Sequence, residues 1–176
     1  MRLFYAVDLR FPDALRDLVG PGPGHFHVTL RFLGETPAEG RPAWEAALAE
    51  AAGTVGPFDL ELRGIGAFPN AHAPRVLWVG CGAGEAALTG LARGLEAALA
   101  ARGLPPEDRP FRAHATLRRI RGAADERWAR PLLARGAGVA FGSQRIGELV
   151  LYESRLSQSG AEHERLAAAP LAGPSP

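Results

Sequence analysis

Two segments of the chain repeat the same residue types, His-x-Thr-Leu-Arg. The first begins at His27 and the second at His114, almost half of the 176-residue chain further on. An imidazole can give or take a proton near neutral pH, and a threonine hydroxyl can donate a hydrogen bond to an anion. If His27, Thr29, His114 and Thr116 surround one small anion, they suit phosphoryl transfer without a covalent intermediate. One neutral histidine would take a proton from water while the other gives one to the leaving oxygen.

Both repeats lie in predicted strands, each after a loop and before a helix. Alternate side chains of a strand share a face, with histidine and threonine about 6.6–6.8 Å apart along it. The first, third and fifth residues of each repeat are therefore predicted to share a face: His27, Thr29 and Arg31 in the first, and His114, Thr116 and Arg118 in the second.

The rest of the sequence predicts an α+β chain. Strands are expected at Leu3–Leu9, Phe26–Leu33, Phe58–Ile65, Val76–Val79, Phe111–Ile120, Ile146–Tyr152 and, as a short strand, His163–Leu166. Helices are expected at Pro37–Ala52, Leu88–Leu99 and Ala123–Ala134. Because the repeat is half the chain long, we expect one bilobal domain over residues 1–176, with two similar lobes related by a pseudo-two-fold axis.

Composition excludes several classes of protein. The chain has no lysine, so P-loop enzymes, Schiff-base enzymes and ligases with an adenylated lysine are excluded. A single cysteine, Cys81, leaves no intrachain disulfide and no cysteine zinc site. The formal charge is only +1, and no apolar run approaches the roughly 18 residues of a membrane span. We therefore expect a cytoplasmic protein that does not contact a membrane.

The sequence resembles the 2H phosphoesterases, specifically the bacterial and archaeal RNA 2′,3′-cyclic phosphodiesterases once called 2′-5′ RNA ligases. Besides both repeats, the resemblance rests on Arg2-Leu3-Phe4, Phe68-Pro69, Pro74-Arg75-Val76-Leu77-Trp78, Phe111 to Arg119, Glu153-Ser154-Arg155-Leu156 and Gly160. It implies a bilobal α+β fold with mainly antiparallel sheets around a central cleft. It also implies metal-independent opening of a cyclic phosphate to a 2′-phosphate, with His27 as proton donor and His114 as proton acceptor.

Two positions leave questions open. Strand alternation puts Arg118 on the face of the second repeat, whereas the family pattern points to Arg119 as the substrate-binding arginine. His163 stands where the family more often has tyrosine. Both arginines belong to a run without acidic residues that could attract an RNA terminus: Arg109, Arg112, Arg118, Arg119 and Arg121.

The sequence offers only part of a metal site. His25 and His27 could form a His-x-His metal pair, but the third ligand would have to be His114 or a carboxylate, and no carboxylate has the expected spacing. We therefore predict no metal and no cofactor. The expected partner is RNA with a 2′,3′-cyclic phosphate end or a cyclic nucleotide, bound by a monomer. Alternatives are a non-catalytic RNA-end binding protein, a phosphodiesterase for small cyclic nucleotides, and a reversible 2′-5′ ligase.

Overall fold

The structure is a computed structural model that describes residues 1–157 and 160–174. Its strands are β1 (Arg2–Asp8), β2 (His27–Glu35), β3 (Phe58–Phe68), β4 (Val76–Cys81), β5 (His114–Arg119), β6 (Ala140–Ile146), β7 (Glu148–Ser157) and β8 (Gly160–Pro170). Its helices are α1 (Asp13–Val19), α2 (Arg41–Ala52), α3 (Glu85–Ala100) and α4 (Ala123–Arg135), with a 3₁₀ turn at Ala38–Gly40.

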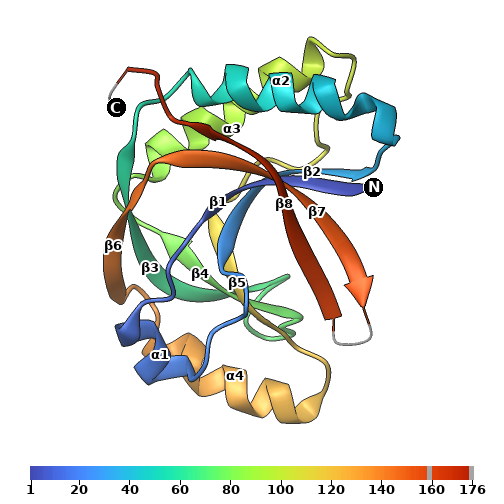
Figure 1. The fold of residues 1–176 in the computed structure, drawn as a ribbon. Coiled ribbons are helices and arrows are strands. Elements are labelled where there is room, and N and C mark those ends of the chain that lie inside the picture. Colours follow the sequence, from blue (N-terminus) through green and yellow to red (C-terminus); the bar gives the residue numbers. More distant parts are fainter. Residues whose placement is uncertain (158–159, 175–176) are drawn as a thin grey trace.

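The strands form one curved sheet in the order β6-β3-β4-β5-β2-β1-β7-β8, and the strand pairs are antiparallel (Figure 1). The two strands that carry the repeats, β2 and β5, are neighbours in the middle. They meet where Val28 pairs with Ala115, and each has three further strands on its outer side. The predicted α+β class with mainly antiparallel pairing is confirmed.

The helices lie at opposite ends of the molecule: α2 and α3 pack together at one end, and α1 and α4 lie at the other (Figure 1). Helix α3 buries Leu88, Leu91, Leu95 and Leu99, which recur at helical spacing. Val28 and Ala115 are fully buried in the same hydrophobic core. The middle of the sheet is therefore covered on one face by helices, which leaves its other face for the chemistry.

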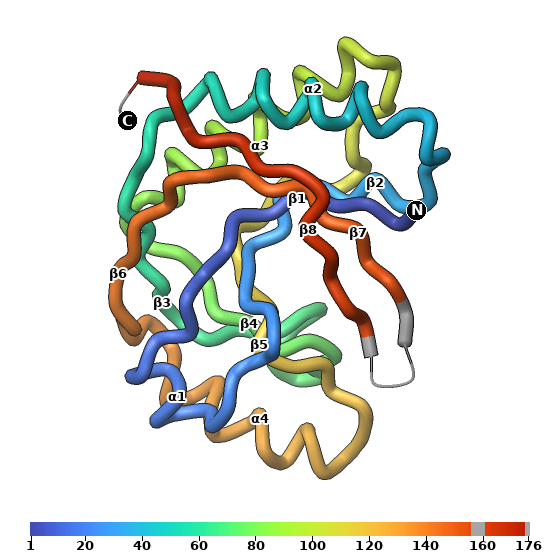
Figure 2. Tube along the Cα trace, in the orientation of Figure 1, coloured from blue at the N-terminus to red at the C-terminus, as the bar shows by residue number. Residues whose placement is uncertain are grey.

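Segments from both ends of the chain build the half that contains β2. Figure 2 shows the β7–β8 hairpin, in orange and red, crossing the blue strand β1. Strand β7 pairs with β1 from Leu3 opposite Glu153 to Ala6 opposite Val150. Residues from the C-terminal hairpin can therefore contact residues near the N-terminus.

The sequence patterns missed two elements and shortened a third. Helix α1 has only seven residues, too few for a clear apolar periodicity, and begins directly after Pro12. Edge strand β6 buries only Phe141 and Ile146, so its apolar pattern is weak. Strand β8 extends well beyond the expected His163–Leu166. None of the described helices is long and apolar enough to cross a membrane.

Candidate active site

The two repeated histidines begin neighbouring strands. His27 is the first residue of β2 and His114 the first of β5. Because Val28 and Ala115 pair and point into the core, the residues before and after them project from the opposite face. The antiparallel register then puts Thr29 beside His114, and the threonine of the second repeat beside His27. The strands thus bring both His-Thr pairs of the prediction, including Thr116, to one face.

Both imidazoles are held by the same kind of hydrogen bond. Nδ1 of His27 lies 3.3 Å from the carbonyl oxygen of His25, and Nδ1 of His114 lies 2.7 Å from that of Arg112. A carbonyl can only accept, so Nδ1 of each ring carries the hydrogen and donates it. This bond fixes the ring orientation and leaves Nε2 as the nitrogen available for proton transfer.

A β-bulge in each repeat changes which residues share the face of the histidines. In β2, Thr29 pairs with Ala6 but Arg31 pairs with the adjacent Tyr5, so Leu30 is the extra residue. In β5, Thr116 pairs with Trp78 but Arg118 pairs with the adjacent Leu77, so Leu117 is extra. One extra residue moves every following side chain to the other face. The prediction that the repeated arginines share the face of the histidines was therefore wrong.

Both arginines turn instead toward acidic residues of helices. Arg31 is 6% exposed, and its Nη1 lies 3.0 Å from Oε1 of Glu96 in α3. Arg118 has its Nη2 3.1 Å from Oδ1 of Asp125 in α4, and its guanidinium lies over the Trp128 ring. Past the bulge, Arg119 pairs with Val76, two residues from Trp78 on β4, and so points to the face of the histidines.

Titratable side chains surround His27. Its ring stacks on His25 with centroids 4.3 Å apart, and the ring of His163 lies 5.4 Å away. The pKa of His27 is lowered to about 4, mainly by burial and also by His25 and His163, against the raising effects of the His25 carbonyl and Asp8. Without a ligand, His27 is therefore neutral at pH 7.

Aromatic side chains surround His114. The Phe68 ring meets it edge-on at 4.8 Å, and the Trp78 ring lies 6.1 Å away. The pKa of His114 lies below its usual value, mainly because the ring is buried. The hydrogen bond to the carbonyl of Arg112 raises this pKa, and the charge of Arg112 lowers it. A Cβ at Gly66 would collide with the Trp78 ring, so a glycine is needed where the indole lies against the sheet.

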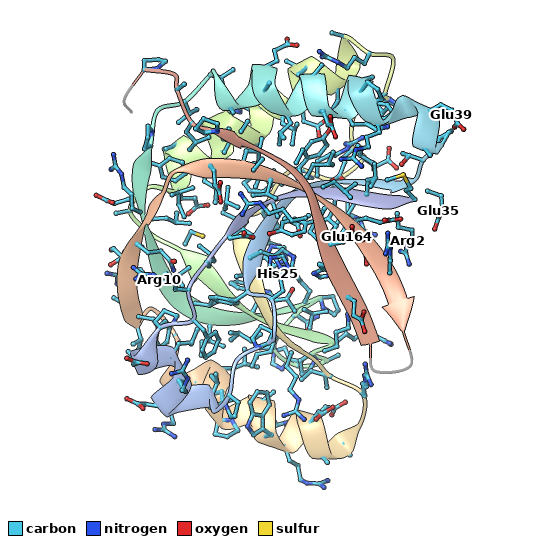
Figure 3. The ribbon with its side chains drawn as sticks, viewed as in Figure 1. Arg2, Arg10, His25, Glu35, Glu39 and Glu164 are labelled. Carbon is cyan, nitrogen blue, oxygen red and sulfur yellow. The ribbon has the colours of Figure 1, made fainter. Side chains whose placement is uncertain are left out.

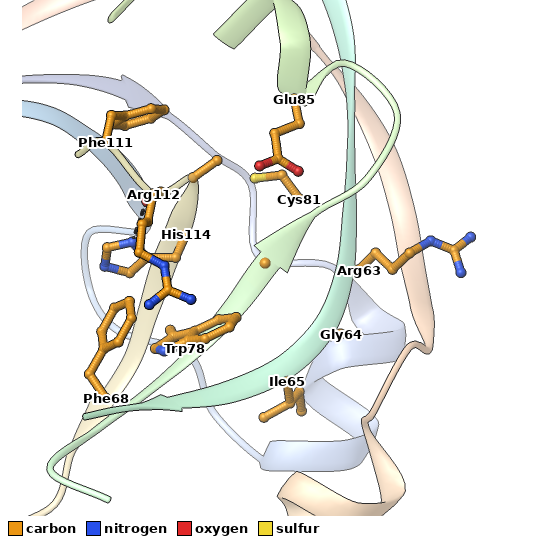
Figure 4. Close-up of a pocket in the computed structure, with 12 residues that line it drawn as sticks. Arg63, Gly64, Ile65, Phe68, Trp78, Cys81, Glu85, Phe111, Arg112 and His114 are labelled. Atoms are coloured by element: carbon orange, nitrogen blue, oxygen red, sulfur yellow. Dashed lines mark hydrogen bonds between the residues drawn. The ribbon is translucent and has the colours of Figure 1, made fainter. Parts of the chain in front are cut away.

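A cavity of about 380 Å³ opens beside His114 (Figure 4). Its walls include Phe68, Trp78, Phe111 and Arg112, and the Arg112 guanidinium lies 5.1 Å from the centre of the Phe68 ring. Flat aromatic rings and an arginine plane are surfaces on which nucleobases stack. The sequence indicated Arg112 as one of several arginines that could attract an RNA terminus, but it did not place the aromatic walls in a pocket, because alternation along β4 does not say which face binds substrate.

Three histidines lie close enough to hold a metal ion, and the third is His163, whereas the sequence indicated His114 or a carboxylate. Ligand-capable nitrogens of His25, His27 and His163 lie within 4.8 Å of one another. His25, near the middle of the molecule (Figure 3), also places Nε2 2.9 Å from Oδ1 of Asp8. His163 meets the Phe4 ring edge-on at 4.9 Å, so an imidazole makes a ring contact at the position where the family more often has tyrosine.

The fold, an antiparallel sheet with a pair of His-Thr motifs on neighbouring central strands, matches that of the 2H phosphoesterases. Residues 13–78 and 79–161 match the profile of the family described as LigT like Phosphoesterase, and the chain belongs to this family. Membership places it among enzymes that act on phosphoric esters.

Known proteins resemble the chain over most of its length. A protein of Aeropyrum pernix named RNA 2′,3′-cyclic phosphodiesterase is 36% identical over 144 residues, which cover 81% of this chain and 80% of that protein. A crystal structure of a protein from Thermus thermophilus has a TM-score of 0.75 and 34% identity, covering 98% of this chain and 99% of the other. The crystal structure of E. coli LigT complexed with 3′-AMP has a TM-score of 0.69 and 28% identity, covering 97% of each chain.

Proposed function

We propose that this protein is a metal-independent RNA 2′,3′-cyclic phosphodiesterase that leaves a 2′-phosphate. The observation that carries the proposal is the pair of histidines on adjoining strands, each with Nδ1 bonded to a carbonyl and Nε2 left for proton transfer. The names of the relatives agree with this activity. Both histidines come from one chain, so we expect a monomer to be active.

In the proposed step, a water oxygen attacks the phosphorus while the bond to the 3′ oxygen breaks. His114 takes a proton from the water and His27 gives a proton to the departing 3′ oxygen, which becomes a hydroxyl. Thr29 and Thr116 donate hydrogen bonds to the non-bridging oxygens, where negative charge develops. The assignment of donor and acceptor rests on the family resemblance.

The charge on the substrate is central to the donor role of His27. The free protein keeps His27 neutral, because burial and two neighbouring histidines lower its pKa. An anionic phosphate between the rings favours the imidazolium form and raises the pKa of both catalytic histidines. We infer that substrate binding itself loads the proton onto the donor.

The nucleoside before the cyclic phosphate would lie in the cavity beside His114. Phe68 and Trp78 offer ring faces to a base, and Arg112 can stack or contact a phosphate. Arg119, on the same face, would contact the phosphate, whereas Arg118 already pairs with Asp125. An RNA end therefore fits this side of the cleft better than the side of the three histidines.

The test uses an RNA with a 2′,3′-cyclic phosphate end in excess EDTA. We expect hydrolysis to a 2′-phosphate, identified by chromatography against both isomers, and no reaction with the His27→Ala/His114→Ala double mutant. Loss of activity that added metal restores would contradict metal independence. Tight binding of the RNA without any product would instead support the non-catalytic RNA-end binder. A 2′,3′-cyclic nucleotide assayed in parallel tells whether the RNA chain is needed.

A further inference from the structure

We propose that His25, His27 and His163 bind a divalent transition-metal ion of the Zn²⁺ class, and that the bound ion inhibits the enzyme. Ligand-capable nitrogens of these rings lie within 4.8 Å of one another, and Nδ1 of His25 is 2.8 Å from Nδ1 of His163. Imidazole is a ligand that suits zinc, copper and nickel. The described part of the chain thus places three such ligands around one point.

The spacing needs only a small adjustment. A Zn²⁺ ion about 2.0–2.1 Å from each nitrogen sets tetrahedral ligands about 3.3 Å apart. The largest separation in the cluster would therefore shrink by at most about 1.5 Å, which an imidazole can cover by turning about its χ angles. The shortest separation would open slightly as the ion replaces the hydrogen bond between His25 and His163.

The surroundings already orient two of the rings as metal ligands. Nε2 of His25 donates to Asp8, whose carboxylate also accepts a hydrogen bond from the Tyr152 hydroxyl at 2.7 Å. Nδ1 of His27 donates to a backbone carbonyl. Metal-binding histidines usually donate their second N–H to a carboxylate or carbonyl, which fixes the tautomer and the ring orientation. This arrangement directs Nδ1 of His25 and Nε2 of His27 to the ion.

The three histidines match the ligand set of a zinc site with one open coordination position. Three histidines bind zinc in sites that keep a fourth position for water or substrate. The carboxylate of Asp8 contacts His25 rather than the ion, so its negative charge compensates the metal only from a distance. We therefore expect reversible binding that a chelator reverses.

The bound ion would inhibit the enzyme because one of its ligand atoms is needed for catalysis. Nε2 of His27 is the nitrogen that carries the proton in the proposed function, and a metal bound there uses its lone pair. The inhibitory half of the proposal thus rests on the proposed function, whereas the binding half does not.

Binding is tested on metal-free protein by calorimetric titration with Zn²⁺ and by the visible absorption of bound Co²⁺. We expect one ion per chain, and at least tenfold weaker binding in both His163→Phe and His25→Phe, because each retains a ring but loses a ligand. His72→Phe, in an exposed loop, is the matched control and should bind as the unchanged protein does. Unaltered binding by both cluster variants would overturn the site, as would the absence of stoichiometric binding.

Inhibition is tested by hydrolysis of the cyclic phosphate with and without added Zn²⁺. We expect Zn²⁺ to inhibit the unchanged protein, EDTA to restore it, and His163→Phe to be active and at least tenfold less sensitive to Zn²⁺. Stoichiometric binding with full activity would refute the inhibition. Absence of hydrolysis in EDTA would refute the proposed function instead, and the calorimetric result would still decide the metal site.

Discussion

The two repeats share a motif and a bulge but lie in contrasting surroundings. His27 lies among His25, His163 and the carboxylate of Asp8, all able to carry charge. His114 lies against the rings of Phe68 and another aromatic residue, beside a cavity. The local sequence therefore fixes ring orientation in both halves, while strands distant in the sequence decide what each ring contacts. In the function proposed above, the first half would control protonation and the second half would bind the nucleoside.

The largest effect should come from removing either imidazole. His27→Ala and His114→Ala should each lower kcat by roughly 10²–10⁴, because each removes one proton transfer of a single step. The double mutant should be little worse than the poorer single mutant, as for groups that act as a unit. Single-turnover assays in EDTA measure this. Strictly additive losses would mean that the two histidines act independently, and the halves would then not form one site.

The threonines should matter less and unequally. Thr29→Ala and Thr116→Ala should each slow hydrolysis by roughly 10–100-fold, the effect of losing one hydrogen bond to a charged group. The larger loss is expected for Thr29, which is half-buried, because Thr116 is exposed and water can replace its hydroxyl. Thr36→Ala is the control, since its hydroxyl bonds to the carbonyl of Met1 far from the cleft. Equal rates in all three variants would remove the threonines from the mechanism.

The pH profile separates the roles of the two halves. The donor must be protonated, so activity falls about tenfold per pH unit above its pKa; the acceptor must be neutral, so activity falls equally below its pKa. We expect a bell, with the alkaline limb absent in His27→Ala and the acid limb absent in His114→Ala. Because burial and the neighbouring histidines lower the pKa of free His27 to about 4, its limb should lie at lower pH in kcat/KM than in kcat. If His27→Ala loses the acid limb instead, the donor and acceptor roles are exchanged.

The smallest effect distinguishes two neighbouring arginines. Arg119→Gln should raise KM roughly three- to tenfold and weaken its salt dependence, because one phosphate contact is lost. Arg118→Gln should leave KM unchanged and cost at most about 1 kcal/mol of stability, as expected for an exposed ion pair with Asp125. Steady-state kinetics at two salt concentrations and urea unfolding measure both. A change in KM confined to Arg118→Gln would assign the phosphate contact to that residue.

The repeat made the central strands predictable. Two histidines with the same neighbours predicted β2 and β5 and their common face, because alternation over three residues is reliable in a strand. Alternation no longer predicts the face of the residues after Leu30 and Leu117, because a β-bulge lies at each of them. A bulge depends on the pairing strand, so the local sequence does not reveal it.

The residues that contact His27 and His114 could not be predicted from the sequence for another reason. His163 reaches His27 because β8 pairs with β7, and β7 with β1. Trp78 reaches His114 because β4 pairs with β5. Such contacts depend on strand order, and the local pattern of one strand contains no information about its partner. The sequence did not predict the cluster of three histidines for the same reason, since only His25 and His27 are close in the sequence.

The pairing of Val28 with Ala115 means that buried residues help to position the imidazoles of His27 and His114. Both side chains are fully buried against the helical core, and neither can touch a substrate. The side chain of Ala115 points into the core, so a larger residue there would press β5 away from the elements packed behind it, since cores as dense as organic crystals do not absorb added volume. The imidazole of His114, the preceding residue on β5, would then move although every residue that faces it is unchanged. The position of the proposed proton acceptor therefore depends on a core residue that does not line the cavity.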